Sequence, residues 1–163
     1  MNTIRRALTI AGMIAASLAL SACATAPAPA NLADTLARNP QLSTFNRLIE
    51  QAGMKEALRA AGPLTVFAPS DEAFKAVPAK TMEALAADKT QLQAVLNFHI
   101  VPSKLLAADV KNGNVKTVHG ANIALSRAGD FVTIEDGMVQ QANISATNGV
   151  AHVIDRVLTP PKK

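Results

Sequence analysis

GPLTVFAPSDEAFKAVP, residues 62–78, is the stretch in which a strand gives way abruptly to a helix. Residues 64–68 form a short, mostly apolar run, which is typical of a strand covered on both faces. Pro69 cannot donate a hydrogen bond to a sheet and so predicts the end of that strand. Ser70 is placed to cap the following helix, and two acidic residues occupy its first turn, where negative charge suits the helix dipole. Residue chemistry alone therefore indicates a structural junction.

The same stretch also resembles a known sequence motif. Residues 65–74 (TVFAPSDEAF) resemble the first signature box of fasciclin-type (FAS1) domains. Residues 148–160 (NGVAHVIDRVLTP) resemble the second box, and residues 96–99 (LNFH) resemble the central Tyr-His element between the boxes. The three motifs stand in the family's order, and the resemblance extends over residues 31–160.

The resemblance implies an α+β fold, the FAS1 β-sandwich or wedge, with several helices packed at its N-terminal side. The two boxes would pair there as central neighbouring strands. The motif residues would hold the fold rather than touch a ligand. They are Thr65, Phe67, Ala68, Pro69, Ser70, Asp71, Phe74, His99, Gly149, His152, Ile154, Asp155, Leu158 and Pro160.

The start of the chain predicts export and lipid attachment. Two arginines precede an apolar run that is too short to span a bilayer, as in a signal peptide. The run ends in LSAC, which resembles a bacterial lipobox. We expect a lipoprotein signal peptide at 1–22, a lipidated Cys23 with an Ala/Pro-rich tether at 23–30, the FAS1 domain at 31–160 and a short tail at 161–163. The alternative is an ordinary signal peptide cut at an Ala-x-Ala-like site.

Acylation of Cys23 would anchor the protein to the cell envelope, because several acyl chains bind a membrane stably. Ala24, rather than an aspartate, follows the cysteine, which implies sorting to the outer membrane, on its periplasmic or surface face. Cys23 is the only cysteine, so the domain is expected to rely on packing without a disulfide.

Composition argues against nucleic acid as a partner. The formal charge of +4 falls to +2 once the two leader arginines are removed, and the chain has neither Trp nor Tyr for base stacking. No internal repeat is visible, so we expect a single module. The oligomeric state is left open by the sequence.

Periodicity predicts helices first and strands later. Apolar spacing indicates helices over 32–38, 42–52 and 80–87, and Asp88 is placed to cap another. Residues 98–101 are predicted to be a strand. The later strands are separated by Gly- and Asn-containing turns and are predicted to form antiparallel hairpins; they cover 115–118, 122–126, 131–134, 138–145 and 150–158.

No catalytic or metal-binding constellation is predicted. His99, His119 and His152 have no metal-ligand spacing with each other or with acidic residues. A Ser70, His99 and Asp71 triad is disfavoured, because adjacent Ser and Asp side chains diverge too much to orient one histidine. Buried histidines need partners, and we hypothesise that His99 bonds to the turn at Ser70 and Asp71. We expect no enzyme activity and no cofactor.

The family resemblance implies adhesion or protein–protein and matrix contact, with an unknown protein or matrix partner and a biofilm-type role. In animal adhesion relatives an Asp-Ile pair before the second box contributes to integrin binding. Asn143 stands in place of that aspartate, which argues against integrin-type recognition. The alternative is a periplasmic carrier of a small apolar ligand, a lipid or pigment, in a pocket lined by Met54, Met82 and Met138. A third possibility is an envelope hydrolase.

Overall fold

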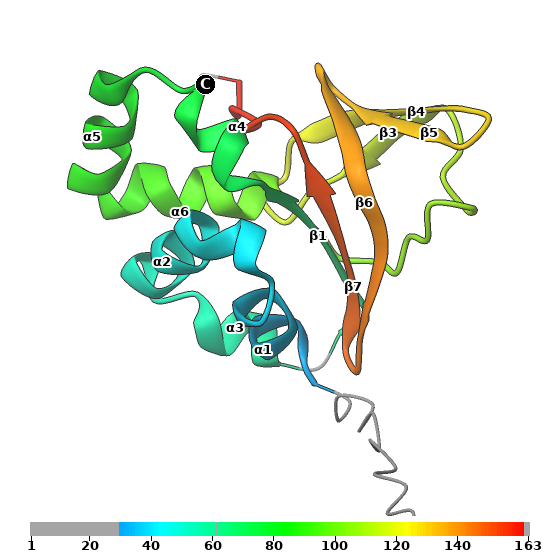
Figure 1. The fold of residues 1–163 in the computed structure, drawn as a ribbon, viewed down its shortest axis with the longest axis horizontal. Coiled ribbons are helices and arrows are strands. Elements are labelled where there is room, and N and C mark those ends of the chain that lie inside the picture. The colour runs from blue at the N-terminus through cyan, green and yellow to red at the C-terminus, as the bar shows by residue number, and fades with distance from the viewer. Residues whose placement is uncertain (1–29, 61, 162–163) are drawn as a thin grey trace, which may run out of the picture.

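The computed structural model describes residues 30–60 and 62–161, in which a helical half precedes a β-rich half (Figure 1). The predicted signal peptide at 1–22 and Cys23 lie outside the described residues. Helices pack against one side of a mixed sheet, as the prediction of an α+β fold requires.

Side-chain caps and a glycine determine where several of the helices begin and end. Asn31 caps α1 by accepting from the Asp34 backbone N–H, and Asp88 caps α6 by accepting from Thr90 and Gln91. Gly53 ends α2 in the left-handed conformation, with a φ of 73°, that glycine adopts readily. The helical elements are α1 (Leu32–Ala37), the 3-10 turn η1 (Pro40–Leu42), α2 (Ser43–Ala52), α3 (Lys55–Arg59), α4 (Asp71–Lys75), α5 (Ala79–Ala87) and α6 (Lys89–Phe98).

Seven strands form one mixed sheet in the order β2-β1-β7-β6-β5-β4-β3. The first signature box supplies β1 and the second supplies β7, and these two strands are parallel neighbours. Every other neighbouring pair is antiparallel. The strands are β1 (Leu64–Pro69), β2 (Ile100–Val101), β3 (Gly113–Lys116), β4 (Asn122–Ala128), β5 (Phe131–Ile134), β6 (Gly137–Ala146) and β7 (Gly149–Ile154).

The sheet separates two apolar cores. Val66 of β1 and Val153 of β7 face the helices, where they join residues of α1, α2 and α6. Phe67 of β1 faces the opposite way and shares the second core with Ile123 of β4 and Ile134 of β5. The β1–β7 half of the sheet and the β3–β5 half therefore face each other across this second core, which gives the predicted sandwich or wedge.

Three predicted strands have wrong boundaries. The strand predicted over 115–118 is β3, Gly113–Lys116, because Thr117 bonds to the Ala121 carbonyl within the turn. Phe98 ends α6 and His99 is its C-cap, so only Ile100–Val101 of the predicted strand 98–101 pairs with β1. The backbone N–H and the ring Nδ1 of His99 each donate to a carbonyl of the last helical turn, which favours helix over strand here. The last predicted strand, 150–158, ends at Ile154, whose carbonyl accepts from the Ser70 N–H in the last pairing with β1 before the chain bends.

We predict that Gly149→Ala destabilises the domain strongly. A Cβ at Gly149 would lie 2.0 Å from the Leu64 carbonyl oxygen and 2.7 Å from a Leu32 methyl group, where β1, β7 and α1 meet. We expect a loss of about 3 kcal/mol in the free energy of unfolding, measured by urea denaturation, as for severe overpacking.

Gly120→Ala is the matched control. Gly120 has a φ of 95° and open space around its Cα, so only backbone strain of about 1–2 kcal/mol opposes that alanine. Equal losses for the two variants would contradict the close approach of β1 and β7.

Candidate functional site

The two signature boxes lie side by side in the middle of the sheet. Their parallel register runs from Leu64 opposite Gly149 to Pro69 opposite Ile154. All residues of β7, and those of β1 from Thr65 to Pro69, are buried. The boxes therefore form the interior of the domain, and only their ends reach the surface.

Polar side chains from these strands hold the loop that follows β2. The hydroxyl of Thr65, which is fully buried, donates to the Ser103 carbonyl (2.6 Å) and accepts from the Leu105 N–H (2.8 Å). Nε2 of His152 donates to the Leu105 carbonyl at 2.8 Å. The side-chain oxygen of Asn143, on β6, accepts from the Ala107 N–H at 2.9 Å. Three strands thus fix the loop through its backbone.

His152 is a satisfied buried histidine, 2 % exposed. Its Nδ1 accepts from the Asn143 backbone N–H at 3.2 Å, and its ring stacks on Phe67 with centroids 5.4 Å apart. Burial lowers the pKa of His152 more than its bond to the Leu105 carbonyl raises it. The side chain is thus held neutral in a single tautomer, with the proton on Nε2.

The hypothesis that His99 bonds to the turn at Ser70 and Asp71 is wrong. Nδ1 of His99 donates to the Val95 carbonyl at 2.8 Å, so Nε2 is free to accept from the Leu158 N–H at 3.0 Å. Both ring nitrogens are therefore engaged elsewhere. His99 is 1 % exposed, and burial lowers its pKa to about 4. The ring joins the end of α6 to the C-terminal segment.

Ser70 and Asp71 each cap a different helix. The Ser70 hydroxyl accepts from the Ala73 N–H (3.3 Å), as predicted for the N-cap of α4. The Asp71 carboxylate reaches α2 instead, where it accepts from the Ser43 hydroxyl (2.7 Å) and the Thr44 N–H (2.8 Å). Partial burial opposes ionisation, but these hydrogen bonds prevail and lower the pKa of Asp71. The triad of Ser70, His99 and Asp71 is not assembled.

The remaining motif residues also serve the scaffold. Phe74 is buried on α4, Leu158 is buried in the second core, and Ala68 and Ile154 are fully buried in the paired strands. The Asp155 carboxylate accepts from the Met138 N–H at 2.7 Å and so holds the start of β6. Pro160 is half-buried near the C-terminus.

His119 lies in the turn between β3 and β4 and is half-buried. Its backbone N–H donates to the Asn97 carbonyl, and its ring meets the edge of Phe98 with centroids 6.0 Å apart. Within residues 30–60 and 62–161, no group of three or more His, Cys, Asp or Glu side chains could hold a metal ion. In the same part of the chain, no helix is long and apolar enough to cross a membrane.

The methionines proposed to line a carrier pocket do not share a cavity. Met54 is buried in the helix-side core, Met138 is 42 % exposed on β6, and Met82 lines a surface groove of about 730 Å³. That groove also contains Asp71 and Lys75, so charged side chains line part of its wall. The three methionines therefore do not form one apolar site.

Comparison with known proteins decides the family. The profile of the Fasciclin domain matches residues 40–160.

The chain belongs to the fasciclin domain family.

Its relatives differ in size. The chain is similar to Protein sll1483 of Synechocystis sp., at 39% identity over 132 residues that cover 80% of this chain and 73% of that protein. It is similar to human periostin at 34% identity, over 82% of this chain but only 16% of periostin. It is similar to the immunogenic protein MPB70 of Mycobacterium bovis at 30% identity, over 76% of this chain and 65% of that protein.

A solved structure shares the fold. The FAS1 domain pair from the insect cell adhesion molecule Fasciclin I superposes with a TM-score of 0.64, at 16% sequence identity, over 80% of this chain and 51% of that chain. The fasciclin domain described here thus spans about half of that pair.

One residue of the fasciclin domain was missed by sequence reasoning. Asn148 opens the second box, and its side chain donates to the Leu58 and Ala60 carbonyls and accepts from the Leu32 N–H. Its partners lie 88 to 116 residues away in the chain, so no local pattern identifies them.

Acid is predicted to destabilise the domain through His99. Its folded pKa of about 4 lies below the ordinary 6.5, so the unfolded chain binds more protons between these values and stability falls as pH falls. The full effect is about 3 kcal/mol, reached near pH 4. Urea denaturation between pH 7.5 and 4.5 should show the decline.

Two variants test the assignment to His99. His99→Gln should lower stability at pH 7.5 and flatten part of the decline. His119→Gln is the matched control, because it removes a half-buried imidazole and keeps His99. A wild-type stability that is constant from pH 7 to pH 5 would contradict the buried neutral state of His99.

Asp71→Ala is predicted to lower the free energy of unfolding by about 1 kcal/mol, because α2 has no side-chain cap of its own at Leu42. The control is Glu72→Ala, since Glu72 pairs with Lys75 at the surface and both side chains are at least 70% exposed. The control should change stability by at most about 0.5 kcal/mol. Thermal or urea unfolding of both variants measures the difference. Equal losses in the free energy of unfolding would contradict the capping role of Asp71.

Proposed function

We propose that this protein is a non-catalytic contact module, displayed at the cell envelope through an acylated Cys23, that binds a protein or matrix component in adhesion of a biofilm type. The observation that carries the proposal is its fasciclin domain, whose fold it shares with an insect cell adhesion molecule.

The chemistry of the signature boxes supports a binding role over catalysis. Thr65, Ser70, His99 and His152 each use their polar atoms to satisfy another part of the domain. A nucleophile needs a base within hydrogen-bond reach, and His99 instead faces two backbone groups. A hydrolase built on these residues therefore has no support from the geometry.

The lipobox-like sequence supports the envelope location. LSAC ends at the chain's only cysteine, and the described domain begins a few residues later. The mechanism is display, in which an acyl anchor and a short tether hold a rigid domain whose exposed surface makes the contacts. The carrier function has less support, because its proposed methionines lie apart.

The test is binding of the soluble domain, residues 24–163, to cells of the producing bacterium and to matrix extracted from them. We expect saturable binding that unlabelled domain displaces, and weaker cell attachment when the gene is deleted. The His99→Ala variant, compared at equal folded concentration, should bind like wild type, because its side chain is buried.

Absence of saturable binding at micromolar concentration would overturn the adhesion proposal. A lipid or pigment released by solvent extraction of the native lipoprotein would then favour the carrier.

A further inference from the structure

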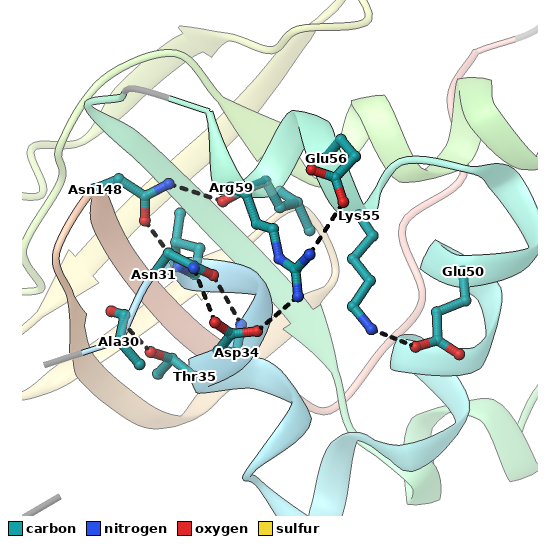
Figure 2. Close-up of polar contacts among 11 residues, drawn as sticks. Ala30, Asn31, Asp34, Thr35, Glu50, Lys55, Glu56, Arg59 and Asn148 are labelled. Atoms are coloured by element: carbon teal, nitrogen blue, oxygen red, sulfur yellow. Dashed lines mark hydrogen bonds and ion pairs between the residues drawn. The ribbon is translucent and has the colours of Figure 1, made fainter. Parts of the chain in front are cut away.

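The first described residues are fixed against the β6–β7 turn (Figure 2). The Ala30 carbonyl accepts from the Thr147 N–H at 2.9 Å and from the Thr35 hydroxyl at 3.3 Å. Two residues later, the Leu32 N–H donates to the Asn148 side chain at 2.8 Å. The chain therefore enters the domain at a defined place, beside the turn that joins β6 to β7.

Asn148 connects this place to two further elements. Its side-chain nitrogen donates to the Leu58 and Ala60 carbonyls, both at 2.8 Å, at the end of α3. Its backbone carbonyl accepts from the Leu64 N–H at the start of β1. We call this set of hydrogen bonds, from Asn148 to α1, α3 and β1, the Asn148 clamp.

Packing and charge strengthen the clamp. Leu32 and Leu36 of α1 are fully buried in the helix-side core, so detaching α1 would expose both. Asp34 accepts from Arg59 of α3 at 3.2 Å, an exposed ion pair that adds little by itself (Figure 2). The start of the domain is thus integrated with its core.

The clamp limits how far the domain can stand from an anchored Cys23. Six residues, 24–29, separate that cysteine from Ala30, and the seven steps between the two residues span at most about 3.6 Å each, or about 25 Å in total. Release of α1 would add residues 30–37 and roughly double this reach. With Cys23 acylated, a reach this short would hold the clamped end close to the bilayer.

The sheet places the signature-box ends far from that position. β1 leaves the clamped end at Leu64 and covers about 20 Å before it reaches Pro69, next to α4. In β6, Ala146 lies at the clamped end opposite Gly149, and Val139 lies toward the other end opposite Ile154. Figure 1 shows α4 at the end of the molecule opposite the start of α1.

Charge also differs between the two ends. At the clamped end, Arg59 pairs with Asp34 and Glu56, and the shallow groove beside the β6–β7 turn adds Lys104 and no acidic residue. The two grooves at the far end are lined by four acidic residues and two basic ones, which are Asp71, Glu72, Glu135, Asp136, Lys75 and Arg156. Anionic lipid headgroups attract a cationic surface and repel an acidic one.

We propose that the Asn148 clamp orients the domain, so that the end with the β6–β7 turn and Lys104 faces the lipid headgroups while the end with α4 and the β5–β6 turn faces the binding partner. The orientation rests on the proposed acylation of Cys23. In this orientation the clamped end lies against the lipid surface, and the two grooves at the far end are accessible to a partner.

Lipid-headgroup quenching tests this orientation in the full-length acylated protein. The protein is purified from its host and placed in vesicles containing a spin-labelled headgroup lipid. Single fluorophores are attached at Thr147→Cys, at the clamped end, or at Asp136→Cys, at the far end; both positions are exposed. We expect several-fold stronger quenching at position 147 than at position 136.

Two further variants increase the distance that the domain can move away from Cys23. Asn148→Ala removes the side-chain clamp, and a seven-residue Gly/Ser insertion between Ala28 and Pro29 lengthens the tether while leaving the domain unchanged. Both should reduce the difference between the two probes. The insertion keeps the test decisive if Asn148→Ala fails to fold.

Mass spectrometry of each preparation separates the possible failures. An acylated protein with equal quenching at both positions, or with a difference that the insertion leaves unchanged, overturns the orientation and leaves the proposed function standing. A protein without acyl mass on Cys23 overturns the anchor and, with it, this orientation.

Discussion

The parallel pairing of β1 with β7 is the constraint on which the rest of the domain depends. The two strands lie far apart in the sequence, yet they pair over six consecutive residues as the second and third strands of the sheet. A pair so placed is covered on both faces, so its side chains must be apolar or must find partners inside. The helices cover one face of this pair, and the strands β3 to β5 cover the other.

The polar residues of the signature boxes follow from this burial. Thr65 and His152 lie within the covered strands, and their polar atoms satisfy the loop after β2, which has no strand of its own to pair with. His99 does the same for the C-terminal segment. An unsatisfied buried polar group would cost about 1–3 kcal/mol, which is comparable to a large part of a small domain's stability. Polar residues in this interior are therefore structural requirements.

Sequence reasoning succeeded where the signal is local. The caps Asn31, Ser70 and Asp88 act on backbone groups within three residues, and the strand over 131–134 is bounded by short turns. The pairing of the two boxes came from the family resemblance, since a parallel pair between distant segments leaves no local pattern. Hydrogen bonds between residues far apart in the sequence could not be predicted from local patterns. His99 meets Leu158 59 residues later, and Asn148 meets Leu32 116 residues earlier.

Asn143 illustrates how scaffold and recognition can share one position. It has a φ of 59°, a left-handed conformation that asparagine tolerates better than most residues. Its N–H supports His152 and its side-chain oxygen supports Ala107. A carboxylate could accept the same bond from Ala107, so an aspartate here would keep the loop in place and add a negative charge to an exposed site. The fold thus constrains the hydrogen bond but leaves the charge at this position free to vary, so the fold alone does not determine what this surface contacts.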